Sequence, residues 1–220
     1  MATLEERLAA QRDASAKRLK PEIGAIVDRH IAHLRETGAP GRALHAGDAA
    51  PAFVLTDQSG TEVSSNALLA GGPLVVSFFR GTWCPYCDTE LLALAESDAD
   101  IRAAGARLVV ITPQAAAAAA PYLATHPLPF PVLVDPDATV AAAFGVAYDV
   151  SGELRDLYAN VFKNDLGAVN AGHSWRLPMP ARFVIDGDGT IVDARVDPDY
   201  RFRPEPAETI AVLQRLRAPS

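Results

Sequence analysis

The first forty residues carry apolar side chains at helical spacing. Thr3 and Glu6 have the spacing of a capping box, Pro21 should divide the segment into two helices, and a turn-forming TGAPG stretch ends it. The apolar positions are Leu4, Leu8, Leu19, Ile23, Ile26, Val27, Ile31 and Leu34. The pattern predicts a helical arm over residues 1–41. Its apolar stripe packs either on its own domain or on a second subunit.

Strand and helix patterns alternate over the rest of the chain. Apolar runs predict strands at residues 53–57, 74–79, 107–112 and 131–135. Helical patterns are present at residues 84–104, 114–124, 138–144 and 205–216. Residues 182–196 predict a hairpin around a Gly-rich turn, and the weakly periodic residues 151–177 predict a long connection with one or two helical turns. Together these elements predict an α/β fold with a mixed central sheet and helices on both faces.

Composition narrows the class of protein. The chain has 220 residues, 49% of them hydrophobic and 21% charged, which is typical of one soluble globular domain with an appendage. A net charge of −7 argues against a nucleic-acid or anionic-membrane partner, since both need a basic surface. The sequence has no apolar run near the ~20 residues that span a bilayer. Its charged N-terminus lacks the apolar core of a secretory signal, so we expect a cytoplasmic protein.

The two cysteines, Cys84 and Cys87, lie three positions apart. In the cytoplasm thiols are kept reduced, so such a pair is more often catalytic or metal-binding than structural. A zinc site would need two further ligands, and none of the five histidines has ligand spacing near a second cysteine. The sequence therefore favours a redox pair without a metal or other cofactor over zinc or two inert thiols.

The pair lies where an apolar strand ends and a helix begins. Free N–H groups and the helix dipole stabilise an anion there, so a thiolate at this position has a lowered pKa. Arg80 could add positive charge, and Pro85 stiffens the first helical turn. The spacing lets Cys84 and Cys87 close a small disulfide within one turn. This is the placement that a nucleophilic cysteine needs.

Two stretches carry a resemblance to a known family. TWCPYC after an apolar strand is similar to the W-C-x-x-C site of the thioredoxin superfamily. The wider FFRGTWCPYCDTELLAL and the later LPMPARFVIDGDGTIVDARVDPDYRFRPEP resemble the peroxiredoxin-like branch of the AhpC/TSA family. The resemblance covers about residues 47–216. It implies a thioredoxin-like domain at residues 47–217, after the N-terminal helical extension, and thiol-based reduction of peroxides or disulfides.

The resemblance assigns roles to the two sulfurs in two ways. Peroxiredoxins show P-x-x-x-T/S-x-x-C with an acidic residue three places later, a pattern that Cys87 and Glu90 match. Cys84 then occupies the hydroxyl position and Arg80 the proline position, so Cys87 would be peroxidatic and Cys84 resolving. On the thioredoxin pattern the exposed Cys84 attacks and the more buried Cys87 resolves. Both assignments stay open.

Other residues near the site take expected roles from the same resemblance. Pro180 stands where the family has its activating arginine and matches instead the cis-proline of thioredoxins. Arg182, two residues further on, or Arg80 would substitute for that arginine. Thr82 belongs to the motif, and Trp83 would shield one side of the cysteines. Asp199, Tyr200 and Arg201 are expected to form surface or subunit contacts.

Three functions follow as hypotheses. The first is a thiol peroxidase acting on hydrogen peroxide or organic hydroperoxides through Cys84 and Cys87, reset by thioredoxin or a similar dithiol. The second is a thioredoxin-like oxidoreductase acting on protein disulfides. The third, of another class, is a non-enzymatic redox sensor or dimerisation module. A homodimer is expected, and the role of the arm in it stays open.

Overall fold

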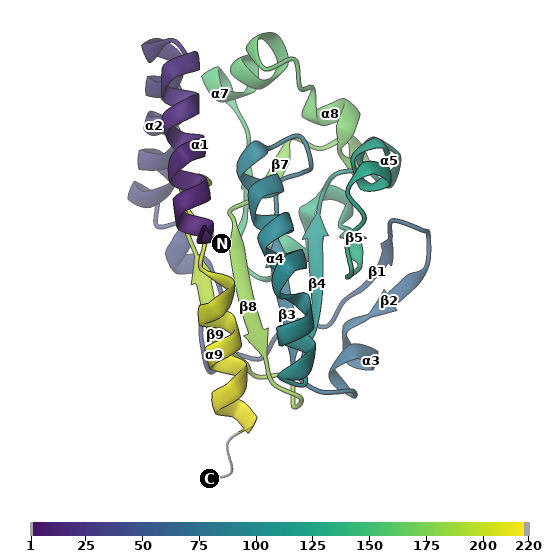
Figure 1. Ribbon diagram of the computed structural model, residues 1–220. Coiled ribbons are helices and arrows are strands. Elements are labelled where there is room, and N and C mark those ends of the chain that lie inside the picture. The colour runs from purple at the N-terminus through teal and green to yellow at the C-terminus, as the bar shows by residue number, and fades with distance from the viewer. Residues whose placement is uncertain (1, 218–220) are drawn as a thin grey trace.

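The computed structural model describes residues 2–217, and its centre is a seven-stranded mixed sheet (Figure 1). The strand order is β2-β1-β5-β4-β3-β8-β9; β3 pairs in parallel with β4 and β4 with β5, and the other pairs are antiparallel. This arrangement confirms the predicted α/β thioredoxin-like fold. The strands are β1 (Val54–Asp57), β2 (Glu62–Ser64), β3 (Leu74–Phe78), β4 (Arg107–Thr112), β5 (Val132–Val134), β8 (Ala181–Ile185) and β9 (Ile191–Val196).

The inner strand β3 is buried along its whole length because both faces of the sheet are covered. Successive side chains of a strand point to opposite faces, so Val76 and Phe78 belong to one hydrophobic core and Val75 and Phe79 to the other. One core lies under α1 (Leu4–Arg18), α4 (Pro85–Ala103) and α9 (Pro206–Arg217). The other includes residues of α2 (Pro21–Glu36) and α6 (Thr139–Ala143). In Figure 1, α4 crosses in front of β3 and β4, with α9 beside it.

The N-terminal arm packs on its own domain. Thr3 and Glu6 form the predicted capping box at the start of α1. Leu8, on α1, is fully buried in the core that α4 and α9 cover, and Ile31, on α2, is buried in the other. These apolar residues are therefore not available to cover a second subunit.

The structure confirms the helix predicted at residues 114–124 and the helical turns predicted within residues 151–177, and it adds several short elements that the sequence did not predict. Residues 151–177 hold the helices α7 (Gly152–Asp156) and α8 (Leu166–Val169) with a π-helical turn at Leu157–Val161. A small antiparallel pair, β6 (Ala147–Asp149) and β7 (Arg176–Pro178), encloses this segment. The remaining elements are α3 (Ser65–Leu69), α5 (Ala116–Thr125) and the 3-10 turns Pro40–Arg42, Pro136–Ala138 and Ala171–His173.

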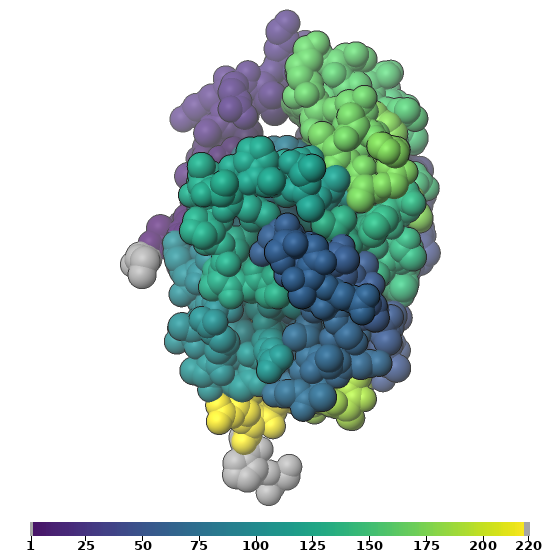
Figure 2. All heavy atoms as spheres, turned by 90° about the vertical axis from the view of Figure 1, so that its right-hand side faces the viewer, coloured from purple at the N-terminus to yellow at the C-terminus, as the bar shows by residue number. Residues whose placement is uncertain are grey.

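The connection is packed rather than loose. Gln114, just before α5, forms a β-bridge with Asn170 after α8. Figure 2 shows the result on the surface, where the green segment of α7 and α8 lies against the teal residues that precede and form α5. None of the helices within residues 2–217 combines the length and apolar character that a bilayer crossing requires.

Candidate active site

The turn from β3 to α4 places both cysteines at one helix mouth. Cys84 is the N-cap of α4, and Pro85 occupies the first helical position, where its missing N–H costs nothing. Gly81 has a φ of +150°, and a Cβ there would come within 2.2 Å of the indole nitrogen of Trp83. A glycine is thus needed for Trp83 to fold back over the turn. Cys87 lies in the first turn of α4, as the sequence predicts.

Both sulfurs are inside the protein. Cys84 is 1% exposed and Cys87 is 0% exposed, and both are free thiols. The expectation that Cys84 lies at an exposed helix start is therefore wrong, because Arg80, Trp83 and Tyr200 pack around the helix mouth. The two thiols lie near enough for each to shift the pKa of the other.

Arg80 places a positive charge beside Cys84. Its Nη1 lies 3.4 Å from Cys84 Sγ, and the guanidinium is buried. The ring of Tyr200 covers it at 3.8 Å from the ring centroid, and Trp83 and Tyr158 flank it at 5.0 Å and 5.5 Å. Burial opposes the charge of Arg80, but the neighbouring thiol and phenol groups, Cys84 first among them, together outweigh it and raise the pKa of Arg80. Arg80 is thus a fixed cation held by aromatic faces.

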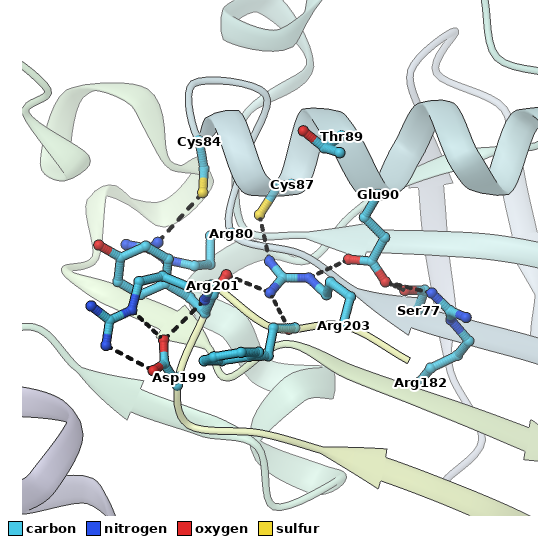
Figure 3. A network of polar contacts seen from close by, with 12 residues as sticks. Ser77, Arg80, Cys84, Cys87, Thr89, Glu90, Arg182, Asp199, Arg201 and Arg203 are labelled. Atoms are coloured by element: carbon cyan, nitrogen blue, oxygen red, sulfur yellow. Dashed lines mark hydrogen bonds and ion pairs between the residues drawn. The ribbon is translucent and has the colours of Figure 1, made fainter. Parts of the chain in front are cut away.

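A second arginine, Arg203, contacts the other sulfur (Figure 3). Its Nη2 lies 3.2 Å from Cys87 Sγ, and its Nε donates to one carboxylate oxygen of Glu90. The other oxygen of Glu90 accepts from Arg182 at 2.7 Å, and all three side chains are almost completely buried. Glu90 therefore holds two arginines in place inside the core. Arg203 was not among the predicted site residues.

Arg182 is connected to the sulfurs only through Glu90 and Arg203. Its guanidinium donates to Glu90 and to the hydroxyl of Thr209 on α9, at 3.2 Å, and has no hydrogen bond to either cysteine within residues 2–217. It therefore supports Glu90, and direct contact with a cysteine falls to Arg80 and Arg203.

The two thiols differ in acidity. For Cys84, burial opposes ionisation, but the hydrogen bond from Cys87 and the charges of Arg80 and Arg203 outweigh it and lower the pKa to about 5. For Cys87, burial and the adjacent Cys84 anion raise the pKa well above its ordinary value. The pair therefore holds one proton and one negative charge at neutral pH, with the charge on Cys84.

The other predicted residues surround this pair. Thr82 donates its backbone N–H and hydroxyl to the side-chain oxygen of Gln114, which ties the turn to the end of β4. Trp83 meets Tyr158 edge-to-face at 5.5 Å and closes one side of the site. Pro180 is buried next to β8, and its peptide bond is trans, so the implied cis form is wrong. Its carbonyl accepts the N–H of Asp197 at 3.2 Å.

The residues after β9 are also placed differently from the prediction. Asp199 is 3% exposed and Tyr200 stacks on Arg80, so neither is a simple surface contact. Arg201 binds Asp199 within its own segment. No local sequence pattern marks these residues, because they reach the site only through the fold. Among residues 2–217, no three His, Cys, Asp or Glu side chains gather as a metal site.

A dithiol at a helix mouth on a thioredoxin-like sheet defines a class, the thiol-based oxidoreductases. Comparison with known proteins gives the family. The AhpC/TSA family model matches residues 46–194. A Mycobacterium tuberculosis protein (Rv2521) whose name assigns it to the peroxiredoxins is 32% identical over 152 residues, which cover 69% of this chain and 85% of that protein. The chloroplastic peroxiredoxin Q of Oryza sativa subsp. japonica is 34% identical over 108 residues, 49% of each chain.

Solved structures agree on the fold. The peroxidoxin BcpB of M. tuberculosis superposes with a TM-score of 0.62 at 24% identity, covering 80% of this chain and 99% of that one. A peroxiredoxin Q of Xanthomonas campestris gives a TM-score of 0.56 at 20% identity, covering 74% and 91%. The chain belongs to the AhpC/TSA family, and it is a thiol peroxidase of the peroxiredoxin type.

Proposed function

We propose that the protein reduces hydroperoxides through a dithiol–disulfide cycle of Cys84 and Cys87. The observation that carries the proposal is that each sulfur has a buried arginine N–H on it, from Arg80 at 3.4 Å and from Arg203 at 3.2 Å. Only a thiolate attacks a peroxide, and these two cations stabilise one. The same cations also lie where negative charge develops on the leaving oxygen.

The chemistry balances with the groups present. The Cys84 thiolate attacks the distal oxygen of ROOH, the O–O bond breaks, and Cys84 becomes a sulfenic acid while RO⁻ leaves. The neighbouring Cys87, which is still a thiol at neutral pH, supplies the proton that converts RO⁻ to ROH. The resulting Cys87 thiolate attacks the Cys84 sulfur, the disulfide forms and hydroxide leaves. Arg203 stabilises Cys87 during this second step.

The substrate and the reductant belong to the same proposal. Both sulfurs are buried, so a small hydroperoxide suits the site better than a large disulfide substrate. A relative of known structure, the bacterioferritin comigratory protein of X. campestris, is described for its alkyl peroxide reduction activity. We include organic hydroperoxides with hydrogen peroxide on that ground. A thioredoxin or similar dithiol would reduce the disulfide by exchange. A homodimer through the apolar stripe of the arm is not supported, because the domain itself covers that stripe.

The order of the two cysteines can be tested directly. Cys84→Ser and Cys87→Ser variants are exposed briefly to hydrogen peroxide, and the remaining sulfur is trapped with dimedone and located by mass spectrometry. We expect rapid trapping at Cys84 in Cys87→Ser and little at Cys87 in Cys84→Ser. The reverse result would assign the attack to Cys87, as the family pattern and its contact with Arg203 suggest. Undiminished peroxide consumption by both variants would refute the dithiol cycle.

A second candidate is reduction of protein disulfides. The lowered pKa of Cys84 at the helix N-cap favours it, because that is the position of the attacking sulfur in the W-C-x-x-C pattern. Insulin reduction at a rate that exceeds peroxide turnover would support this second function. The burial of Cys84 leads us to expect the opposite ranking.

A further inference from the structure

The segment between β9 and α9, residues 197–205, lies across the cysteine site, and we call it the strap. It has no regular secondary structure. It brings Tyr200 over Arg80 and Arg203 onto Cys87 and Glu90. Figure 3 shows the strap residue Arg203 reaching Cys87, and the strap residues Asp199 and Arg201 paired with each other further from the sulfurs. The environment of both cysteines therefore depends on where the strap lies.

The helices of the N-terminal arm hold this strap from outside. From α1, Arg12 donates to the carbonyl of Arg201 at 3.1 Å, and its guanidinium lies 4.4 Å from the centroid of the Phe202 ring. In return, the carboxylate of Glu205 accepts the backbone N–H groups of Leu4 and Glu5, at 3.2 Å and 2.8 Å. The end of the strap thus caps the first turn of α1, where free N–H groups need an acceptor.

The second arm helix holds the strap through ion pairs. From α2, Asp28 binds Arg201 at 2.9 Å, and Arg35 lies 3.7 Å from the carboxylate of Asp197. Arg201 also donates to the buried carboxylate of Asp199. The same guanidinium therefore binds one residue of the strap and one residue of α2. Contacts from both arm helices converge on this segment.

We propose that the arm is a positioning element of the active site: α1 and α2 fix the strap, and the strap sets the positions of Arg203 and Tyr200. The proposal rests on the dithiol cycle described above. If the strap is loosened, Arg203 no longer stabilises the Cys87 thiolate, so disulfide closure slows. Loss of the Tyr200 cover also opens the helix mouth to solutes that the closed site excludes.

The test compares two double variants of equal charge. Arg12→Gln/Asp28→Asn removes arm contacts to the strap. The control, Arg7→Gln/Glu153→Gln, removes two ion pairs that the arm makes elsewhere, Arg7–Glu96 and Arg29–Glu153. Each double variant loses one arginine and one acid. Melting temperatures of both establish that the chains are folded.

Two readouts separate positioning from mere support of the fold. After a peroxide pulse with dimedone present, the strap variant should show several-fold more trapped sulfenic acid relative to disulfide than wild type. Iodoacetamide should also alkylate its cysteines several-fold faster than those of wild type. The rates are compared at a pH high enough that the alkylation rate no longer rises with pH, so that they report access to the sulfur. The control variant should match wild type in both. The conservative Arg12→Lys/Asp28→Glu variant should recover most of the wild-type behaviour.

A further variant shows whether the arm acts through Arg203. Introduced into an Arg203→Met background, the strap substitutions should add little to the sulfenic acid fraction, because the group they position is gone. Equal readouts for the strap and control variants, or fully additive effects with Arg203→Met, would overturn the proposal. Failure of the wild type to form a disulfide with peroxide would instead refute the dithiol cycle, and the alkylation rates would still test the positioning.

Discussion

Glu90 is the buried carboxylate on which the arginine network depends, and its neutralisation is the sharpest test of the site's electrostatics. It is 2% exposed, and it pairs with Arg182 and Arg203, whose side chains are each 1% exposed. Glu90→Gln keeps the size and shape of the side chain but leaves two buried guanidiniums without a counter-charge. Removing one partner of a buried ion pair typically costs about 3–5 kcal/mol.

That cost corresponds to a large fall in thermal stability. For a domain of this size each 1 kcal/mol shifts Tm by about 2–4 °C, so we expect Glu90→Gln to lower Tm by about 6–20 °C. Differential scanning calorimetry of the reduced protein at pH 7 measures it. The matched control is Glu96→Gln, whose partner Arg7 is on the surface. An exposed pair contributes at most about 1 kcal/mol. A Tm for Glu90→Gln no lower than that of Glu96→Gln would refute the account of the network.

Three further outcomes follow from the structure. The ultraviolet absorbance of the Cys84 thiolate should appear as the pH rises through about 5 and vanish below it. Cys87 should ionise only well above the ordinary thiol pKa, so a single step at the ordinary thiol pKa would contradict the assignment. Arg80→Gln should raise the pKa of Cys84 and lower the thiolate fraction at pH 7, so that the first peroxide step slows in stopped-flow measurements. The loss is at most about 30-fold, the value for a full return to the ordinary pKa of ~8.5, because Cys87 and Arg203 also stabilise the thiolate. An unchanged rate would exclude Arg80 from activation. Leu8→Ala, at a fully buried position of α1, should lower the free energy of unfolding, measured by urea denaturation, by about 2–5 kcal/mol. If the arm did not pack on the domain, the same substitution would leave the free energy of unfolding almost unchanged.

Local patterns were enough to predict most of the architecture. The apolar run of β3 and the helical spacing after Cys84 predicted the strand-to-helix turn, because periodicity reports which face of each element is buried. The pair β6–β7 and the strand β2 were missed, since these three-residue strands are too short to show a period and, unlike the equally short β5, are not continuous apolar runs. Their formation depends on pairing with distant segments.

The site itself was only partly predictable. Cys84, Cys87 and Arg80 lie within eight residues of one another, so their meeting follows from one local turn. Arg203 meets Cys87 across 116 positions in sequence, and a lone arginine after the last strand resembles any surface charge. Pro180 does not take the cis form that the resemblance implied, and its carbonyl accepts the N–H of Asp197 at the start of the strap.

The cations that acidify Cys84 also bear on the energetics of the disulfide. When the disulfide closes, the Cys84 anion disappears and the buried charge of Arg80 loses its partner. Arg80 therefore stabilises the reduced state of the pair relative to the disulfide. With the pKa of Cys84 about 5, the thiolate at pH 7 is stabilised over the thiol by about 3 kcal/mol. For a two-electron couple this makes the reduction potential about 60 mV more positive. The oxidised enzyme should therefore accept electrons readily, and a mild dithiol donor is enough to return it to the form that meets the next peroxide.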